Sequence, residues 1–355
     1  MRQMGFSFES FIGIIPHEKE KQKVVCHLKK NDNPTMKDVA REAGVALGTV
    51  SKVINGIPVG ESYRARVEEA INRLGYRVNS YARGLKTNQT NCVALLMPSL
   101  YHPFFAMLTD ELTACLMRYG YRSTLMITNS DPEAEEKCLI LGHENKVDGV
   151  IALTYSPDLR PDDATPMVTI DRHCGDRIPC VSSDNYRGGE MAAEKLAALG
   201  CGRLLFMSVA SDIPGEVDKR GRGFEAACRR LGADFEQIIL HDADTEAPFY
   251  AYLREHIRDG RLDFDGIFCN TDRLACRVRD FLTACGVRIP EDVQLIGYDG
   301  IRNYATGRYD CSTIVQPIPQ IAETAVKLLL EGRGASSPVN VCLPVEYAPG
   351  GTTRE

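Results

Sequence analysis

The segment TMKDVAREAGVALGTVSKVING, residues 35–56, decides the fold of the N-terminal part of the chain. Thr35 and Asp38 have the spacing of a helix capping box, with Asp in the position that Glu usually holds. Apolar residues then recur at helical spacing until Gly44, which ends the helix, and a second short helix runs to the turn pair Asn55-Gly56. Two short helices joined at a glycine are typical of a helix-turn-helix.

A third helix is predicted from about Ser62 to Leu74 and completes a small helical bundle. In a helix-turn-helix the second helix enters the major groove of DNA, where the base edges can be distinguished. Here that helix begins near Ala46, and its outward residues are expected to contact DNA: Leu47, Gly48, Thr49, Ser51 and Lys52, with Thr35 and Asn55 beside them. Val50, Val53 and Ile54 are expected in the core. Thr49 and Ser51 have an alternative role, in which they contact phosphates only.

Beyond Asn91 the sequence alternates between predicted strands and predicted helices. The strands are CVALLMP (92–98), STLMIT (123–128), DGVIALTY (148–155), MVTID (167–171), RLLFMS (203–208), DGIFCNTD (265–272), VQLIGYD (293–299) and the closing CLPVEY (342–347). This alternation predicts parallel sheets with crossover helices, and about 260 residues suffice for two doubly wound subdomains. Asp171, Asp272 and Asp299 stand at strand ends, where such folds bind ligands.

The charge is distributed unevenly along the chain. The whole chain has a net charge of −6, but residues 34–90 hold nine Lys and Arg against five Asp and Glu. A basic head on an acidic body is compatible with binding of the head to DNA phosphates. Thirteen scattered cysteines without C-x-x-C pairs favour a reduced, cytoplasmic chain, and we identify neither a signal peptide nor a membrane span. Residues 1–33 show no continuing period and are interpreted as a disordered extension or a start-site artefact.

The head segment, followed by RARVEEAINRLGYRVNSYARGLKT (64–87), resembles the LacI/GalR family of repressors. The similarity covers residues 35–90 with almost no gaps and continues through about nine-tenths of the chain. Two departures concern the recognition helix. Ala46 stands where the family commonly has a capping Ser, which costs about 1 kcal/mol. Lys52 stands where the family usually has Arg, so the bidentate fork is lost.

The resemblance assigns residues 79–90 to a hinge helix between head and core. A short helix with Gly84 inside it is marginal in water, so we expect it to fold on DNA. In the family, paired hinge helices enter the minor groove and insert a leucine between base pairs, which kinks the DNA. The resemblance places that wedge at Leu85, with Asn79 and Ala82 as further DNA contacts. The alternative is a flexible linker.

The body resembles periplasmic sugar-binding proteins and repressor cores at HPFF (102–105), TIDR (169–172), SSDN (182–185), RGRGF (220–224), CNTD (269–272), LIGYD (295–299) and STIVQP (312–317). The resemblance implies an effector site formed by Phe104, Asp171, Arg172, Arg220, Thr271, Asp272, Asp299 and Gln316. Carboxylates and an arginine suit a hydroxyl-rich ligand such as a sugar. Three of these residues have alternatives: Asp272 as a helix N-cap, Phe104 as core, and Arg172 as the partner of an acid.

The predicted architecture is an all-α helix-turn-helix head (34–78) and hinge helix (79–90), joined to an α/β core (91–355). The core is periplasmic-binding-protein-like, with one doubly wound parallel-sheet subdomain at about 91–182 and 317–345 and another at 183–316 and 346–355. We expect a ligand-responsive repressor that binds operator DNA and a small-molecule effector as a homodimer, without cofactor, metal or membrane. An enzyme is disfavoured because no G-x-S-x-G, metal-spaced His pair or phosphate loop is present. A secreted sugar-binding protein is disfavoured by the head.

Overall fold

The computed structural model describes residues 34–77, 90–161, 165–175, 177–211, 213–241, 247–332 and 339–354. The chain divides into two units, one ending at Asn79 and one beginning at Ser80. The N-terminal extension and most of the hinge segment, with Asn79, Ala82 and Leu85, lie outside the described residues.

The head is a bundle of three helices: α1 Met36–Ala43, α2 Leu47–Ile54 and α3 Glu61–Leu74. The predicted capping box is confirmed, since the Thr35 hydroxyl accepts from the Asp38 N–H while the Asp38 carboxylate accepts from the Thr35 N–H. Gly44 ends α1 in the left-handed region with φ 58°. As expected, Ala46 precedes α2 without a side-chain cap. Val39, Val50 and Val67, one from each helix, are fully buried in the centre of the bundle.

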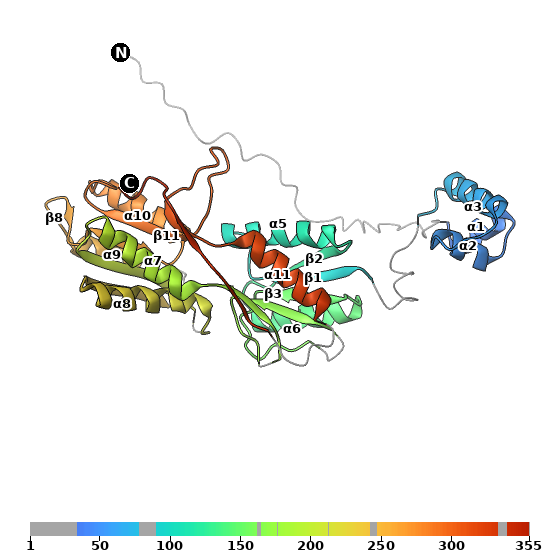
Figure 1. Cartoon of the computed structure of the whole chain (residues 1–355), viewed down its shortest axis with the longest axis horizontal. Coiled ribbons are helices and arrows are strands. Elements are labelled where there is room, and N and C mark those ends of the chain that lie inside the picture. Colours follow the sequence, from blue (N-terminus) through green and yellow to red (C-terminus); the bar gives the residue numbers. More distant parts are fainter. Residues whose placement is uncertain are drawn as a thin grey trace, which may run out of the picture. The chain divides into compact units, whose positions relative to one another are not determined.

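The first sheet of the core is wholly parallel, with strand order β13-β5-β4-β3-β1-β2. Its strands are β1 Cys92–Met97, β2 Arg122–Ile127, β3 Gly149–Ala152, β4 Met167–Ile170, β5 Cys180–Ser183 and β13 Val341–Leu343. Helices α5 Pro103–Arg118 and α11 Ile318–Glu331 cover one face and share one apolar core with it (Figure 1). Helix α6 Pro132–Glu144 packs on the other face.

The second sheet has strand order β14-β12-β11-β10-β6-β7. Its strands are β6 Arg203–Ala210, β7 Asp234–His241, β10 Gly266–Cys269, β11 Gln294–Asp299, β12 Ser312–Val315 and β14 Glu346–Ala348. Helices α7 Asn185–Ala198 and α8 Lys219–Leu231 cover one face, and α9 Ala247–Glu255 and α10 Asp272–Ala284 cover the other. A 3-10 turn, Glu216–Asp218, leads into α8, and a small hairpin joins Ile257–Arg258 (β8) to Arg261–Leu262 (β9). The predicted core of two doubly wound sheets is confirmed.

The chain passes between the sheets three times: from β5 to α7, from β12 to α11, and from β13 to β14. The prediction of one closing strand at 342–347 is therefore wrong. Pro344 lacks an N–H for a ladder, and the segment splits there into β13, parallel to β5, and β14, antiparallel to β12. Strands β5, β7 and β12 were not predicted, because two are only four residues long and β7 is a half-exposed edge strand with mixed polarity.

None of the helices in the described part of the chain combines the length and the apolar character needed to cross a membrane.

Candidate functional site

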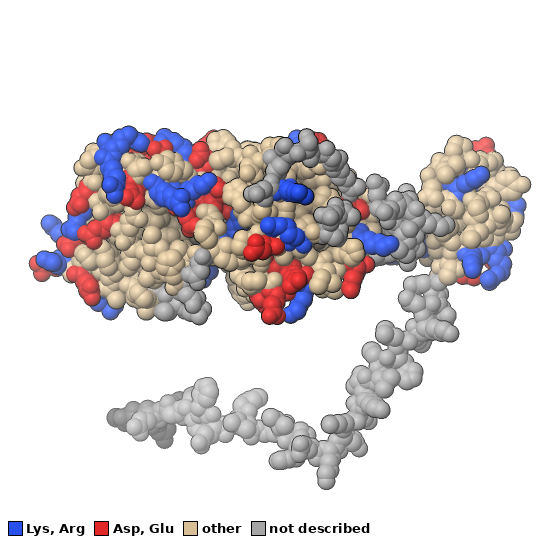
Figure 2. All heavy atoms as spheres, turned by 90° about the horizontal axis from the view of Figure 1, so that it is seen from below, with Lys and Arg blue, Asp and Glu red and all other residues tan. Residues whose placement is uncertain are grey.

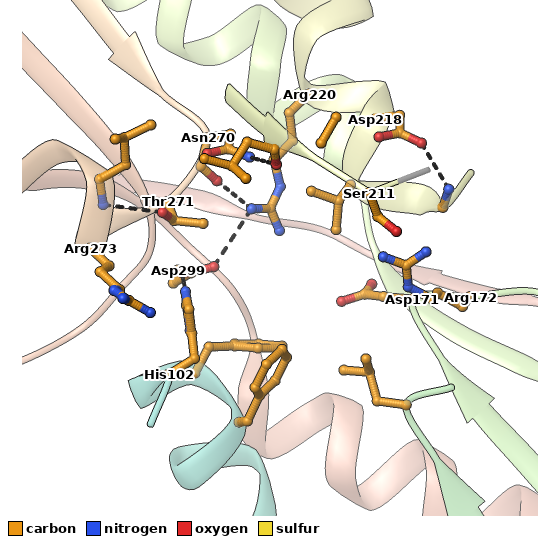
Figure 3. Close-up of a pocket in the computed structure, with 18 of the residues that line it drawn as sticks. His102, Asp171, Arg172, Ser211, Asp218, Arg220, Asn270, Thr271, Arg273 and Asp299 are labelled. Carbon is orange, nitrogen blue, oxygen red and sulfur yellow. Dashed lines mark hydrogen bonds and ion pairs between the residues drawn. The ribbon is translucent and has the colours of Figure 1, made fainter. Parts of the chain in front are cut away.

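A cavity of about 620 Å³ lies between the two sheets of the core, at the carboxyl ends of their strands. The first sheet contributes Leu153 after β3 and Asp171 after β4, and the second contributes the end of β6, Asn270 after β10, and Asp299 at the end of β11. Because each parallel sheet gathers its strand ends at one edge, facing edges bring polar side chains from distant parts of the sequence together (Figure 3). We call this cavity the cleft.

Arg220, in the first turn of α8, is the most constrained cation of the cleft. Its Nε donates to Asn185 Oδ1 at 2.7 Å and its Nη1 donates to the Asn270 carbonyl at 2.5 Å. Nη1 is also 3.7 Å from Asp299 Oδ1, and the guanidinium lies 3.5 Å from the Tyr298 ring centroid. Only 2% of Arg220 is exposed, so its partners hold the guanidinium in one position.

Asp299 ends β11 in a conformation that is unusual for a side-chain-bearing residue, with φ 127°. Gln316 Nε2 donates to Asp299 Oδ1 at 2.8 Å, and Ser183 Oγ of the first sheet donates to Gln316 Oε1 at 2.7 Å. The other oxygen, Asp299 Oδ2, is buried without a hydrogen bond in the described structure. Burial raises the pKa of Asp299 to about 8, although the Arg220 charge opposes the shift.

Asp171 supplies a carboxylate from the opposite sheet, also with a positive φ of 56°. Its Oδ1 is buried without a hydrogen bond among the described residues, and burial raises the pKa of this carboxyl to about 6. The neighbouring Arg172 donates from Nη1 to the Ile213 carbonyl at 2.6 Å and lies 4.0 Å from the Tyr155 ring centroid. The alternative, in which Arg172 pairs with an acid, is not seen among the described residues, where a carbonyl and an aromatic ring contact the guanidinium.

His102, the residue immediately before α5, lines the cleft. Its Nε2 is 4.0 Å from Asp299 Oδ2, and its Nδ1 is buried without a partner among the described residues. Burial, followed by the positive charges of Arg273 and Arg220, lowers the pKa of His102 to about 4. The imidazole is therefore neutral near pH 7 and has one N–H to donate.

Seven of the eight predicted effector residues line the cleft: Phe104, Asp171, Arg172, Arg220, Thr271, Asp299 and Gln316. Asp272 does not line it. The Asp272 carboxylate accepts from the Ile301 N–H at 2.7 Å and from Cys311 Sγ at 3.4 Å, which are internal contacts of the second sheet. The alternative that Asp272 is the N-cap of α10 is also wrong. The N-cap is the preceding residue, Thr271, whose hydroxyl accepts from the Leu274 N–H.

Several polar and aromatic residues of the cleft wall were not predicted from the sequence. They include His102, Tyr155, Ser211, Asp218, Asn270 and Arg273. His102 and Asn270 belong to the segments HPFF and CNTD, and Arg273 directly follows CNTD. Their positions in or beside these segments could therefore have identified all three as residues of the cleft. Phe104 is only 4% exposed and packs edge-on against Phe105, so it contributes apolar wall and core together.

In the head, the predicted DNA-contacting residues of α2 form one outward face. Leu47, Ser51 and Asn55 follow one another at intervals of four, as do Gly48 and Lys52. Leu47 is 42% exposed, whereas Val50, which packs into the core of the bundle, is fully buried. The Asn55 amide donates to the Ser51 carbonyl at the end of α2, and Thr35 is exposed at the start of α1.

The basic side chains of the head differ in their partners. Arg41 and Arg73 pair with carboxylates, and Arg66 donates to the carbonyls of Ala43 and Gly44. Among residues 34–77, four cations make neither an ion pair nor a side-chain hydrogen bond with described residues: Lys37, Lys52, Arg64 and Arg77. By contrast, the face of the core shown in Figure 2 mixes basic and acidic side chains without a continuous patch of one sign.

Comparison with known proteins accounts for both units. Residues 90–338 match the family model of periplasmic binding proteins and the sugar binding domain of the LacI family, and residues 35–79 match that of bacterial regulatory proteins of the lacI family. The chain belongs to the LacI family. This LacI-family protein is a ligand-responsive, DNA-binding transcriptional regulator rather than an enzyme.

Individual relatives agree with this assignment. The sucrose operon repressor of Streptococcus mutans is 30% identical over 319 residues, which cover 88% of this chain and 97% of that protein. A periplasmic binding protein/LacI transcriptional regulator from Alkaliphilus metalliredigens, crystallised with D-xylulofuranose, is 29% identical with a TM-score of 0.64, covering 75% of this chain and 100% of its own. The lac repressor dimer bound to operator and an anti-inducer shares the fold at 21% identity, with a TM-score of 0.76 and coverage of 91% and 100%.

Within the described residues, no group of three His, Cys, Asp or Glu side chains is arranged to hold a metal ion.

Proposed function

We propose that this regulator is a dimeric cytoplasmic repressor that binds a palindromic operator, and that a sugar-like effector in the cleft changes its affinity for DNA. The observation that carries the proposal is the pair of buried, unsatisfied carboxylate oxygens, Asp171 Oδ1 and Asp299 Oδ2, on opposite sheets of one cleft. A buried polar oxygen without a hydrogen-bond partner costs about 1–3 kcal/mol, and a ligand hydroxyl group, which can donate or accept, satisfies either an ionised or a neutral acid.

The composition of the cleft supports a hydroxyl-rich ligand. Carboxylates accept from hydroxyl groups, and Arg220 and Arg172 still offer nitrogen donors beyond those used by the protein. Phe104, Phe105, Tyr155 and Leu153 supply an apolar wall suited to the C–H face of a ring. The D-xylulofuranose complex of the Alkaliphilus relative and the sucrose operon repressor support a sugar as the effector class.

An effector held by both subdomains can act on DNA only through its different affinity for two arrangements of the core. Asp171 belongs to the proposed subdomain of residues 91–182 and 317–345, and Arg220 and Asp299 belong to the proposed subdomain of 183–316 and 346–355. A ligand that bonds to all three favours the arrangement in which they approach. We propose that residues 79–90 transmit this preference to the head as hinge helices that form on operator.

The proposed DNA contacts are the outward face of α2, with Leu47, Gly48, Thr49, Ser51, Lys52 and Asn55, together with Thr35 and the hinge residues Asn79, Ala82 and Leu85. A single head reads one half-site, so two heads related by a two-fold axis read a palindrome. The unpaired cations Lys37, Lys52 and Arg64 supply the charge that phosphates require.

The test begins with selection of DNA by the full chain from a random pool, followed by a thermal-shift screen of sugars, sugar phosphates and nucleobases. We expect palindromic sites to be enriched, sedimentation to give a dimer at micromolar concentration, and one stabilising compound to change operator affinity. Absence of any enriched sequence, a stable monomer, or a ligand that leaves operator affinity unchanged would contradict the proposal.

The hinge assignment has its own test in Leu85→Ala. Removal of the proposed wedge should lower operator affinity at least about tenfold, or about 1.4 kcal/mol, while effector affinity stays unchanged. Operator affinity is measured by fluorescence anisotropy and DNA bending by energy transfer between labelled ends. Parental affinity and bending in the variant would refute the minor-groove assignment.

A further inference from the structure

Arg273 is the one arginine of the cleft wall whose guanidinium has no protein partner in the described structure. It lies in the first turn of α10, close to Thr271 in the sequence, and lines the cavity beside His102 (Figure 3). Within the described residues it makes no hydrogen bond, ion pair or ring contact. Arg172 and Arg220, the other two arginines of the wall, both donate to carbonyls and lie on aromatic rings.

The charges around Arg273 do not neutralise it. Asp299 is engaged by Gln316 and Arg220, and the Asp218 carboxylate accepts from the Gly215 N–H at 2.8 Å. The adjacent Asp272 carboxylate is taken up by the Ile301 N–H, outside the cleft. His102 is neutral near pH 7, so it adds no charge beside the Arg273 guanidinium. The positive end of the α10 dipole adds to the local positive potential.

The cleft therefore presents two different needs. Asp171 Oδ1 and Asp299 Oδ2 lack hydrogen-bond partners, which hydroxyl groups supply. Arg273 lacks an acceptor, and a guanidinium is best matched by a carboxylate or a phosphate because both accept its two parallel N–H bonds. A neutral sugar can form hydrogen bonds with the two carboxyl oxygens, but it offers no anionic group to Arg273.

We propose that the effector is a polyhydroxyl compound with one terminal anionic group, a carboxylate or a phosphate, and that Arg273 binds this group while Asp171 and Asp299 form hydrogen bonds with hydroxyl groups. The inference rests on the proposed function of the cleft and narrows its ligand class. Arg273 is thereby the specificity-determining residue that separates charged from neutral members of one sugar series.

The experiment compares matched ligands on the full chain by calorimetry. The probes are D-ribose with D-ribonate and D-ribose 5-phosphate, and D-glucose with D-gluconate, D-glucuronate and D-glucose 6-phosphate. In at least one series, a charged member should bind at least about tenfold more tightly than its neutral parent. The carboxylate and phosphate arms then identify which anion the cleft takes.

Substitution locates the source of the preference. Arg273→Gln should remove about tenfold of the charged ligand's affinity, about 1.4 kcal/mol, and leave the neutral sugar within about twofold. Arg273→Lys should retain part of the preference because it keeps the charge but loses the fork. Arg277→Gln is the matched control, since it makes the same charge change on the same helix outside the cleft wall, and it should bind every ligand like the parent.

Three outcomes overturn the inference. The first is that neutral sugars bind as tightly as their charged partners, and the second is that no charged member binds at concentrations up to ~10 mM. The third is that Arg273→Gln retains the full preference for the charged ligand. Sugar-dependent release of operator by neutral sugars alone would refute the anionic group and keep the proposed function. Loss of all ligand-dependent change in operator affinity would refute the proposed function itself.

Discussion

The head and the cleft use their polar residues in opposite ways. In α2 the proposed DNA contacts lie on one exposed helix face, where Lys52 has no partner in the described structure and Gly48 has no side chain. In the cleft, Arg220 and Asp299 are each 2% exposed and are held by at least two neighbours. The first surface is available to adapt to a partner, whereas the second is fixed before its ligand arrives.

This difference has a physical cause. A side chain that contacts DNA phosphates remains hydrated until binding and needs no internal partner. A buried ion in an apolar core has to be compensated, so the protein supplies carbonyls, amides and an aromatic ring around Arg220. Preorganisation lowers the ordering cost on ligand binding and makes the cleft sensitive to small shifts of its supporting helices.

The largest effect is expected for Gly189→Ala. A Cβ at Gly189 in α7 would overlap the backbone carbonyl of Arg220 in α8, so the helices must separate and Arg220 must move. The core should lose about 3 kcal/mol of unfolding free energy, as for strong overpacking. In the head, the same substitution at Gly48 meets no atom within 4 Å and should instead stabilise α2 by about 0.8–1 kcal/mol.

Hydrogen exchange on peptides from α7 and α2 measures the two regions separately in the full chain. Faster exchange in α7 of Gly189→Ala and slower exchange in α2 of Gly48→Ala are expected. Equal small effects of the two substitutions would show that the close helix contact at Arg220 does not constrain the core.

A smaller effect, on effector affinity and not on the unfolding free energy, is expected for Arg220→Ala. This substitution removes a cation of the cleft without changing the backbone. Effector affinity should fall by at least about 100-fold, or about 2.7 kcal/mol, because Asp299 and Asn270 lose their shared partner. If the effector is an inducer, operator binding without effector stays near the parental value; if it is a corepressor, the variant fails to bind operator. Arg230→Ala, on the exposed side of α8, is the control. Parental effector affinity and response in Arg220→Ala would remove this residue from the site.

The smallest effect concerns pH. The folded-state pKa values of Asp171 and Asp299, about 6 and about 8, are above the ordinary value of 3.8. Raised values mean that the neutral acids stabilise the empty core at low pH, and that this contribution is lost as the pH rises from about 4 to 8. Between pH 6 and pH 8 the ligand-free core should lose on the order of 2 kcal/mol from Asp299.

Asp299→Asn should flatten this part of the pH profile, because the amide does not ionise. Exchange of core peptides at several pH values, corrected for the intrinsic rate, gives the slope, and peptides from the head serve as an internal reference. A profile of Asp299→Asn that falls as steeply as that of the parent would show that Asp299 is already ionised at pH 6.

The sequence by itself determined much of the head. Thr35, Asp38 and Gly44 define α1 through contacts within a few residues, and the missing cap at Ala46 is equally local. The outward face of α2 follows from helical periodicity alone. In the core, the alternation of strands and helices and the polar residues at strand ends predicted the fold class and placed Asp171 and Asp299 at the cleft.

Only the tertiary structure decided which neighbours of a strand end face the ligand. Thr271, Asp272 and Arg273 are consecutive, but each step along a helix turns the side chain by about 100°, so Asp272 faces Ile301 while Arg273 faces the cleft. Likewise, the split of the closing strand at Pro344 depended on which sheet offered a free edge to each half. These choices involve groups far apart in the sequence, and local periodicity carries no information about them.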